Sequence, residues 1–420
     1  MRILVLTNLA PHPAHTARAA NVVVFQLITA LAKQEGIESC CLRVEREVAP
    51  NLTNDEVEGE RLMREAGAAL FPPVTLPPAA PRRPALLRGL WPTEIDYVPE
   101  ASHRPLLQEA VATAEADIIL VPWTEWLTAL CAGLPGKKFA YYGNPPPKNT
   151  RAWRNFSRTH GGDRWALLRQ TIYNRRLEAF HLKQMRRYDW LGNVAANDAG
   201  YYRRHGHPNA FYIQNMWIDR FGESWRMRRT VGGGRPIRIV SNVGYLAGTA
   251  NTHGLEILGC NLLPELRRAM GGHEYIVEIM GTGDAHPAIR PFLDVPEVRL
   301  RGFVDDIDAE MLDAELFLCM NNASAYNVGH TRYLHAWSLG CCVVAHRNAA
   351  LTMPEIVHGK NALLGGSPAE IADLIASAAA DPVLRRRLGE GGYQTFRENF
   401  TAEHVATRIA AECRKLGGVP

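Results

Sequence analysis

Cysteine is sparse and without pattern in this sequence of 420 residues. The eight cysteines include no C-x-x-C motif and no cysteine-rich cluster, so the signature of a disulfide framework or of a zinc site is missing. We therefore expect reduced, mostly buried thiols, and we predict no metal site.

Long apolar runs are missing as well. The N-terminal segment MRILVLT has only four consecutive apolar residues, which indicates a first β-strand rather than a signal peptide. The more apolar stretch from Ile118 to Pro135 is interrupted by Pro122 and carries Glu125, a pattern of strand, turn and helix rather than of a membrane span. We expect a cytoplasmic location, and a peripheral position on the inner face of the membrane stays open.

Neither sign of charge dominates the sequence as a whole. Lys and Arg number 47 against 43 Asp and Glu, a formal net charge of +4, and this mild excess does not by itself indicate nucleic acid. The apolar fraction of 46% and the charged fraction of 21% are ordinary for a soluble globular protein. At this length, two or three domains with an ample core are expected.

One segment departs from this balance of charge. Residues 151–190 carry ten basic and three acidic side chains, with Trp153, Phe156 and Trp165 interleaved, and we predict a helical stretch from Arg151 to Tyr188. Such a surface suits an anionic membrane or a phosphate-bearing acceptor. A solvated helix face over core aromatics is the alternative. No nucleic-acid module accompanies the charges, so nucleic acid is not an expected partner.

Two successive α/β patterns divide the chain. The first opens with a strand at RILVLT, a helix over residues 22–33 and a second strand, and this βαβ unit implies a parallel sheet with ligands at the carboxyl ends of its strands. The second opens with a strand over residues 237–242. The polar, basic segment between them contains three consecutive glycines and is predicted to be an interdomain linker. The predicted fold class is α/β with two doubly wound, Rossmann-like domains, over residues 1–219 and 237–400, joined by a linker over residues 220–236.

The stretch from Asn321 to Gly366 is the most informative part of the second pattern. Gly329, His330 and Thr331 open a predicted short helix that Gly340 ends. The apolar run CCVVA that follows is typical of a buried strand. A loop that contains glycine and leads into a helix N-terminus favours anions, because free N–H groups and the helix dipole both attract phosphate.

This stretch resembles the donor-binding segment of retaining GT-B glycosyltransferases, the family 4-like proteins of group 1. The family motifs "G-x-P-V-V" and "P-E-I-V-x-x-G-x-N-G-L-L" correspond to residues 340–344 and 354–364. Weaker matches to "V-x-I-x-G-x-G" and "G-F-V-x-D" lie in order before them. The resemblance covers nearly the whole chain. It implies two lobes facing across a cleft that holds the active site, with a closing helix over residues 401–420 that returns to the first lobe.

The resemblance also implies roles for particular residues. The family usually places two glutamates eight residues apart in this segment, and Asn327 and His335 stand in their places. Asn144 stands near the position of a family histidine, and we expect Arg332 to stabilise the leaving diphosphate. The predicted catalytic residues are thus Asn144, Asn327 and Arg332. The predicted donor-binding residues are Gly244, Gly302, Phe303, Val304, Gly329, His330, Thr331 and His335, and the predicted acceptor-side residues are His12 and His15.

The activity implied by this resemblance is transfer of a sugar from a nucleotide diphosphate sugar to a hydroxyl acceptor, with retention of the anomeric configuration and without an obligatory metal or cofactor. The acceptor could be a glycan, a lipid-linked molecule or a small molecule. Because both family glutamates are replaced, two alternatives stay open. One is a catalytically degenerate protein that binds a nucleotide sugar or a partner without turnover, and the other is a sugar-nucleotide epimerase.

Overall fold

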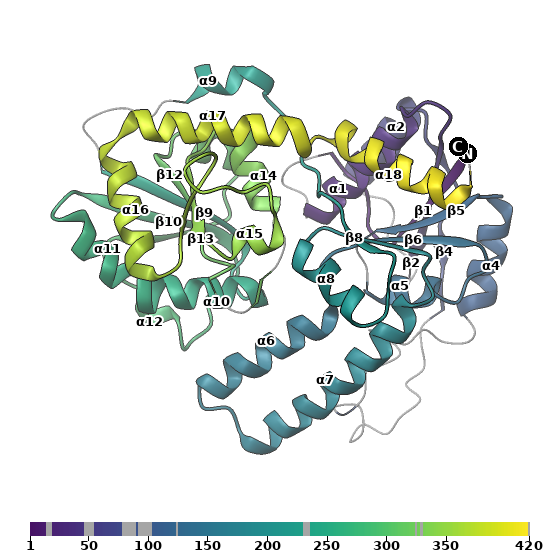
Figure 1. The fold of residues 1–420 in the computed structure, drawn as a ribbon, viewed down its shortest axis with the longest axis horizontal. Coiled ribbons are helices and arrows are strands. Elements are labelled where there is room, and N and C mark those ends of the chain that lie inside the picture. The colour runs from purple at the N-terminus through teal and green to yellow at the C-terminus, as the bar shows by residue number, and fades with distance from the viewer. Residues whose placement is uncertain are drawn as a thin grey trace. The chain divides into compact units, whose positions relative to one another are not determined.

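The computed structural model describes residues 1–13, 19–45, 54–77, 90, 103–122, 125–229, 236–323, 326–327 and 331–418 (Figure 1). The chain forms two compact units. Unit 1 comprises Met1–Met216 together with Ala402–Pro420, and unit 2 comprises Trp217–Thr401. Each unit is built around its own parallel sheet, which confirms the predicted α/β fold class with two doubly wound domains.

Unit 1 contains an eight-stranded sheet in which all neighbouring strands run parallel. The order is β3-β2-β1-β5-β6-β7-β8, with β4 paired to β2. The strands are β1 (Arg2–Thr7), β2 (Glu38–Glu45), β3 (Ala69–Leu70), β4 (Val74–Thr75), β5 (Ile118–Pro122), β6 (Lys137–Tyr142), β7 (Trp190–Asn193) and β8 (Ala210–Tyr212). Central strands such as β1, whose Ile3 to Leu6 are fully buried, are continuously apolar because both faces of the sheet are covered.

The helices of unit 1 follow the strands in the order expected of βαβ connections. They are α1 (Ala19–Ala32), α2 (Asn54–Glu65), α4 (His103–Thr113), α5 (Glu125–Cys131), α6 (Pro146–Thr159), α7 (Arg164–Met185), α8 (Ala196–Arg204) and α18 (Ala402–Gly417). The last helix buries Val405, Ile409 and Cys413 and lies against α1. The indole Nε1 of Trp190 also donates a hydrogen bond to its Glu412 carbonyl at 3.0 Å.

The basic segment of unit 1, predicted to be helical, forms two helices. Figure 1 shows α6 and α7 side by side, extending away from the sheet of unit 1 as a hairpin. The break falls at Gly161, whose φ of 79° favours glycine. Asp163 then caps α7 by accepting a hydrogen bond from the Ala166 amide at 2.8 Å.

Unit 2 contains a six-stranded parallel sheet in the order β11-β10-β9-β12-β13-β14. The strands are β9 (Ile237–Tyr245), β10 (Tyr275–Thr282), β11 (Val298–Gly302), β12 (Leu316–Cys319), β13 (Val343–His346) and β14 (Leu363–Gly365). Numbered along this sheet, the order is 3-2-1-4-5-6, the doubly wound arrangement of dinucleotide-binding folds. The direction of winding reverses between β9 and β12, which makes this the switch point of the sheet.

The helical elements of unit 2 include the segment expected to be a linker. They are η1 (Gly222–Ser224), α9 (Trp225–Arg228), α10 (Thr249–Ile257), η2 (Leu258–Leu262), α11 (Leu263–Met270), α12 (Arg290–Leu293), α13 (Ile307–Leu312), α14 (Thr331–Ser338), α15 (Ala349–Thr352), α16 (Pro368–Ala380) and α17 (Pro382–Asn399). In the described part of residues 220–236, Trp225 is buried, and Arg229 donates a hydrogen bond to the Ala314 carbonyl at 2.7 Å. This part of the segment therefore packs onto unit 2.

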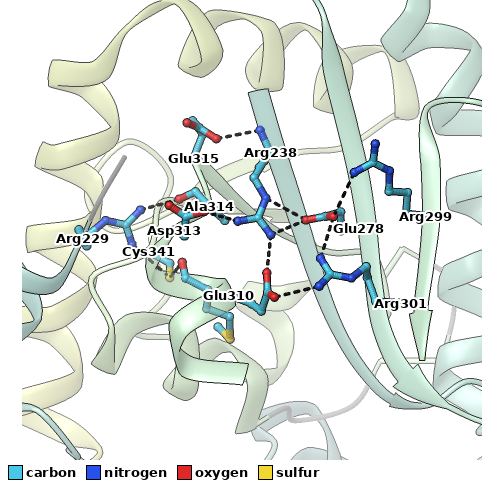
Figure 2. A network of polar contacts seen from close by, with 11 residues as sticks. Arg229, Arg238, Glu278, Arg299, Arg301, Glu310, Asp313, Ala314, Glu315 and Cys341 are labelled. Carbon is cyan, nitrogen blue, oxygen red and sulfur yellow. Dashed lines mark hydrogen bonds and ion pairs between the residues drawn. The ribbon is translucent and has the colours of Figure 1, made fainter. Parts of the chain in front are cut away.

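A network of charged side chains joins β9, β10 and β11 to α13 (Figure 2). Glu278 in β10 is 2% exposed and accepts hydrogen bonds from Arg238 and Arg301, each at 2.9 Å. Arg301 also donates to Glu310 at 2.9 Å. Burial alone would raise the pKa of the Glu278 carboxyl, but the hydrogen bonds from Arg238 and Arg301 hold this pKa below its usual value.

The cysteines and the lengths of the helices agree with the sequence. All eight cysteines are free thiols, and seven of them are buried, as predicted. Among the helices in the described part of the chain, none has the length and apolar character needed to cross a bilayer.

Candidate functional site

The switch point of unit 2 is held together by buried amide side chains. Asn251 of α10 donates hydrogen bonds to the carbonyls of Val243, at 2.9 Å, and of Tyr245. Asn321, which follows β12, donates to the Asn251 Oδ1 at 2.7 Å. These bonds fix the loop after β9 against the loop after β12. In open α/β sheets, the crevice outside this point of the sheet is the usual place for a ligand.

Arg332 brings a buried positive charge to the switch point. It lies in the first turn of α14, and its Nη2 donates a hydrogen bond to the Val243 carbonyl. Its Nη1 is also buried and has no hydrogen-bond partner of acceptable distance and angle among the described residues, although the nearby Cys319 side chain acts against the effect of burial on the pKa of the guanidinium. Burial lowers the pKa of the guanidinium, because a charge removed from water is destabilised.

This environment favours an anion. Among the residues that the structure describes, no carboxylate forms an ion pair with Arg332, although many other arginines of the protein have one. An uncompensated buried charge is unfavourable, and a phosphate oxygen would supply both the missing charge and the missing acceptor.

The backbone beside Arg332 leaves room for a ligand to approach it closely. Gly244 has a φ of 75°, and a Cβ added to it would meet no atom within 4 Å. On the neighbouring strand, a Cβ on Gly281 would lie 2.7 Å from the Gly244 carbonyl oxygen. Glycine at 281 is therefore required by packing, whereas glycine at 244 is favoured by its positive φ and leaves open space beside the backbone near the end of β9.

Two aromatic side chains stand exposed at the carboxyl ends of these strands. Tyr245 at the end of β9 is 60% exposed, and Phe303, directly after β11, is 64% exposed. Phe303 follows Gly302, whose φ of 68° turns the chain at this point, and Val304 is half-buried behind it. Exposed aromatic faces at this edge of the sheet could stack on a planar ring. The sequence analysis included Phe303 but missed Tyr245.

His335 is buried, unlike the exposed Tyr245 and Phe303. It is 5% exposed, and its Nε2 lies 2.6 Å from the Asp308 Oδ1. Asp308 also forms an ion pair with Arg220 at 2.9 Å, and the His335 ring lies 5.5 Å from the ring of Trp217. A ribose hydroxyl would therefore have to be bound through Nδ1, since Nε2 is already engaged.

The remaining predicted residues are placed as follows. Asn327 and Thr331 are both half-buried in the described part of the loop and at the start of α14, while Gly329 and His330 lie outside the described residues. In unit 1, His12 is half-buried, and its backbone amide donates to the Asn21 carbonyl at 3.3 Å; His15 lies outside the described residues. Asn144 follows β6, and its Oδ1 is buried without a hydrogen-bond partner among the described residues.

Comparison with known proteins places this geometry in context. Residues 238–381 match the family described as glycosyl transferases group 1. No match to a curated protein was found. Similar solved structures include sucrose-phosphate synthase from Thermosynechococcus elongatus, with 15% identity, a TM-score of 0.64 and full coverage of both chains.

Two further solved structures have a similar fold. HepE from Anabaena, in complex with UDP and glucose, has 13% identity and a TM-score of 0.57, with 97% of this chain and 98% of that chain covered. The apo structure of OtsA has 11% identity and a TM-score of 0.60, with 99% of each chain covered. At these identities the likeness establishes the fold, two parallel-sheet α/β domains as in GT-B glycosyltransferases. The segment that matches the family contains Gly244, Phe303 and Arg332.

Proposed function

We propose that the protein transfers a glycosyl group from a nucleotide diphosphate sugar to a hydroxyl acceptor. The observation that carries this proposal is the buried guanidinium of Arg332 at the switch point of unit 2, whose Nη1 finds no hydrogen-bond acceptor among the residues that the structure describes. It lies in the segment that matches glycosyl transferases group 1. A similar structure contains UDP and glucose, which supports a nucleotide sugar as the donor.

In this proposal, different residues at the switch point bind different parts of the donor. Arg332 contacts the diphosphate and stabilises the charge that develops on it when the sugar leaves. Gly244 allows the backbone to approach the phosphates, and the exposed faces of Tyr245 and Phe303 lie where a base could stack. Because a fixed cation compensates the leaving group, no metal ion is obligatory.

Retention of the anomeric configuration is part of the same proposal. It is supported by the resemblance of residues 354–364 to the donor-binding segment of retaining enzymes. The replacement of both family glutamates by Asn327 and His335 favours the second candidate, a protein that binds a nucleotide sugar without turnover. An epimerase would convert the donor with no acceptor present, so product analysis separates all three.

A position on the membrane surface is a further part of the proposal, and it is supported by the α6–α7 hairpin. Trp165 is 78% exposed and Leu168 49% exposed near the start of α7. Both are surrounded in sequence by exposed arginines. Aromatic and cationic side chains together are typical of surfaces that bind anionic lipid.

The proposal is tested by replacing Arg332 with methionine, which keeps the bulk of the side chain and removes the charge. Arg332→Met should weaken binding of UDP, ADP or GDP, whichever the wild type binds, by about 1.5–3 kcal/mol, the usual worth of a hydrogen bond to a charged group. It should not lower the melting temperature of the free protein, because an uncompensated buried charge is removed. Calorimetry and thermal unfolding measure the two effects.

Arg268→Met is the matched control, since Arg268 is an exposed arginine of unit 2 with surface ion pairs to Glu265 and Asp373. If no nucleotide diphosphate binds the wild type, or if Arg332→Met binds as well as Arg268→Met, the proposed site is wrong. Release of nucleoside diphosphate from a panel of nucleotide sugars, measured with and without acceptors, then distinguishes transfer from binding without turnover.

A further inference from the structure

Helix α14, which carries Arg332 in its first turn, contacts the two segments where the chain enters and leaves unit 2. One turn after Arg332, the His335 ring lies 5.5 Å from the ring of Trp217, the first residue of unit 2. The Trp337 ring lies 6.0 Å from the ring of Phe400, next to the last residue of unit 2. The Trp217 amide donates a hydrogen bond to the Phe400 carbonyl at 3.1 Å. The position of α14 is therefore linked to both of these segments.

The buried carboxylate of Asp308 in α13 joins α14 to the entering segment a second time. Its Oδ1 lies 2.6 Å from the Nε2 of His335, and its Oδ2 accepts a hydrogen bond from Arg220 at 2.9 Å. Asp308 lies in the first turn of α13, where the helix dipole favours a negative charge. A buried carboxylate is stable only where donors compensate it. Asp308 therefore restricts where His335 can lie, and with it the position of α14.

A shift of α14 would also move the guanidinium of Arg332. Arg332 and His335 are three residues apart, so their side chains leave the same side of the helix. The Nη2 of Arg332 donates to the Val243 carbonyl at the switch point. A diphosphate would need the remaining N–H groups in fixed places, because hydrogen bonds weaken steeply with distance and angle. A displacement of about 1 Å can reduce the rate of an enzyme by about 100-fold.

We infer that Asp308 is a positioning residue of the donor site, which acts through His335 to hold α14 where Arg332 can contact the diphosphate. This role rests on the proposed function, in which Arg332 binds the diphosphate. It assigns part of the affinity for the donor to a side chain that does not itself touch the donor. The affinity that depends on Asp308 is then affinity for the diphosphate and not for the ribose, which distinguishes positioning from a direct contact of His335 with the ribose.

The test compares nucleotide binding by the full-length wild type, Asp308→Asn, Arg332→Met and the double variant, by calorimetry or, where binding is weak, by NMR titration. Asparagine keeps the size of the side chain and an oxygen acceptor for His335, but it removes the charge. Asp308→Asn should weaken binding of UDP, ADP or GDP, whichever the wild type binds, by about two- to thirtyfold. In the Arg332→Met background the same replacement should have no further effect, because Asp308 acts through Arg332.

The matching nucleoside, uridine, adenosine or guanosine, is the second probe. It has the base and the ribose but no phosphate for Arg332 to bind. Asp308→Asn should therefore leave nucleoside binding unchanged. An equal loss of affinity for the nucleoside and for the nucleoside diphosphate would overturn the positioning role, since Asp308 would then act on the ribose through His335. If the nucleoside binds too weakly to measure, the double variant decides alone.

Glu310→Gln is the matched control, because it removes a carboxylate from the same helix whose ion pairs are with Arg238 and Arg301 on the sheet. It should leave nucleotide binding unchanged. Arg220→Met removes the other partner of Asp308 from a side chain that is 45% exposed. It should weaken binding of the nucleoside diphosphate by about twofold or more, and it replaces Asp308→Asn in the comparison if that variant does not fold.

Thermal unfolding of each variant ensures that affinities are compared between folded proteins. The inference is overturned if Asp308→Asn binds nucleotide as well as Glu310→Gln, or if it weakens binding equally with and without Arg332→Met. Weaker binding by Arg332→Met, with no effect of Asp308→Asn, would refute the positioning role and leave the proposed donor site intact. Binding by Arg332→Met that equals the wild type would refute the donor site itself.

Discussion

At the scale of the residue, Glu278 links the charge network of unit 2 to acid sensitivity. Its folded-state pKa is held below the usual value by Arg238 and Arg301, against the opposing effect of burial. A depressed carboxyl pKa contributes stability that is fully present above the unfolded-state pKa, about 4.3 for glutamate, and is lost as the pH falls through the folded-state pKa.

The replacement Glu278→Gln should therefore destabilise unit 2 at pH 7 by about 1–3 kcal/mol, since charge-assisted hydrogen bonds to Arg238 and Arg301 are lost or weakened while both arginines keep their ion pairs with Glu310. The difference in unfolding free energy between wild type and variant should narrow at pH 3.5, because the carboxyl of the unfolded wild-type chain is then mostly protonated, below its pKa of about 4.3. Urea unfolding at both pH values measures it. Glu265→Gln, in an exposed pair with Arg268, should cost less than about 1 kcal/mol at either pH. A penalty for Glu278→Gln that is the same at both pH values would refute the linkage.

His335 was expected from the family pattern to bind the ribose of the nucleotide, and this expectation stays a prediction. If it is right, His335→Ala weakens nucleotide binding by about 0.5–1.5 kcal/mol, the net worth of one hydrogen bond. The contact with Asp308 predicts in addition that alanine lowers the free energy of unfolding by about 1–3 kcal/mol. Calorimetry and urea unfolding on one preparation of each protein measure both quantities.

Replacing His335 with glutamate distinguishes a role in nucleotide binding from a role in stability. His335→Glu would bring a second carboxylate to the Oδ1 of Asp308, which now lies 2.6 Å from the imidazole, so a large loss of stability is expected. If the variant instead stays as stable as wild type and binds nucleotide more tightly, the position faces the ligand as in the family.

Single residues of the site differ in how far the sequence could predict them. Arg332 and Gly244 lie in the segment that resembles the family, so the sequence could single them out, and their roles stay predictions. The engagement of His335 by Asp308 could not, since those residues are 27 positions apart and meet only through the packing of α13 against β9 and of α14 against β12. Tyr245 was missed for a similar reason. An aromatic residue at the end of a strand has the same sequence pattern whether it is buried or exposed.

At the scale of the element, the α6–α7 hairpin carries the membrane proposal. Vesicles containing phosphatidylglycerol should bind the protein at about 50 mM salt and release it at about 500 mM, because exposed charges are screened beyond about 10 Å already at 0.1 M. Replacing Trp165 and Leu168 together by alanine should weaken binding, since their apolar surface no longer enters the interface. Flotation of vesicles measures the bound fraction.

Met227→Ala is the matched control for this experiment, because Met227 is 85% exposed but lies in α9 of unit 2. Binding that is absent at low salt would contradict the membrane proposal. Equal binding by the hairpin variant and the Met227 variant would place the lipid contact elsewhere on the protein.

Helices and strands whose ends are marked by short sequence patterns are the easiest to predict from the sequence. Ser367 caps α16 by accepting a hydrogen bond from the Glu370 amide at 3.2 Å, and the sequence Ser367-Pro368-Ala369-Glu370 has the S-x-x-E pattern that is typical of a helix N-terminus. The helical stretch predicted from Arg151 to Tyr188 is divided into α6 and α7 at Gly161, and Asp163 caps the second helix. The contact between Lys148 and Asp198 spans 50 positions, and no local pattern marks it.

At the scale of the whole molecule, the chain leaves unit 1 near Met216 and returns to it at Ala402. Unit 1 is thus completed only by its last helix. In α18, Val405, Ile409 and Cys413 are fully buried, and Lys137 donates to the carbonyl of Gly417 at 3.1 Å. Unit 2, by contrast, is continuous in sequence.

Removal of residues 402–420 should therefore unfold unit 1 and spare unit 2. Burial of three apolar side chains contributes about 1.5–3 kcal/mol each, and the total is comparable with the 5–15 kcal/mol that stabilises a typical domain. Scanning calorimetry should show the loss of one of two transitions, with the other unchanged. A protein shortened only by residues 418–420 keeps α18 and should retain both. If the longer truncation also retains both transitions, α18 is dispensable and the division of the chain into these two folding units is wrong.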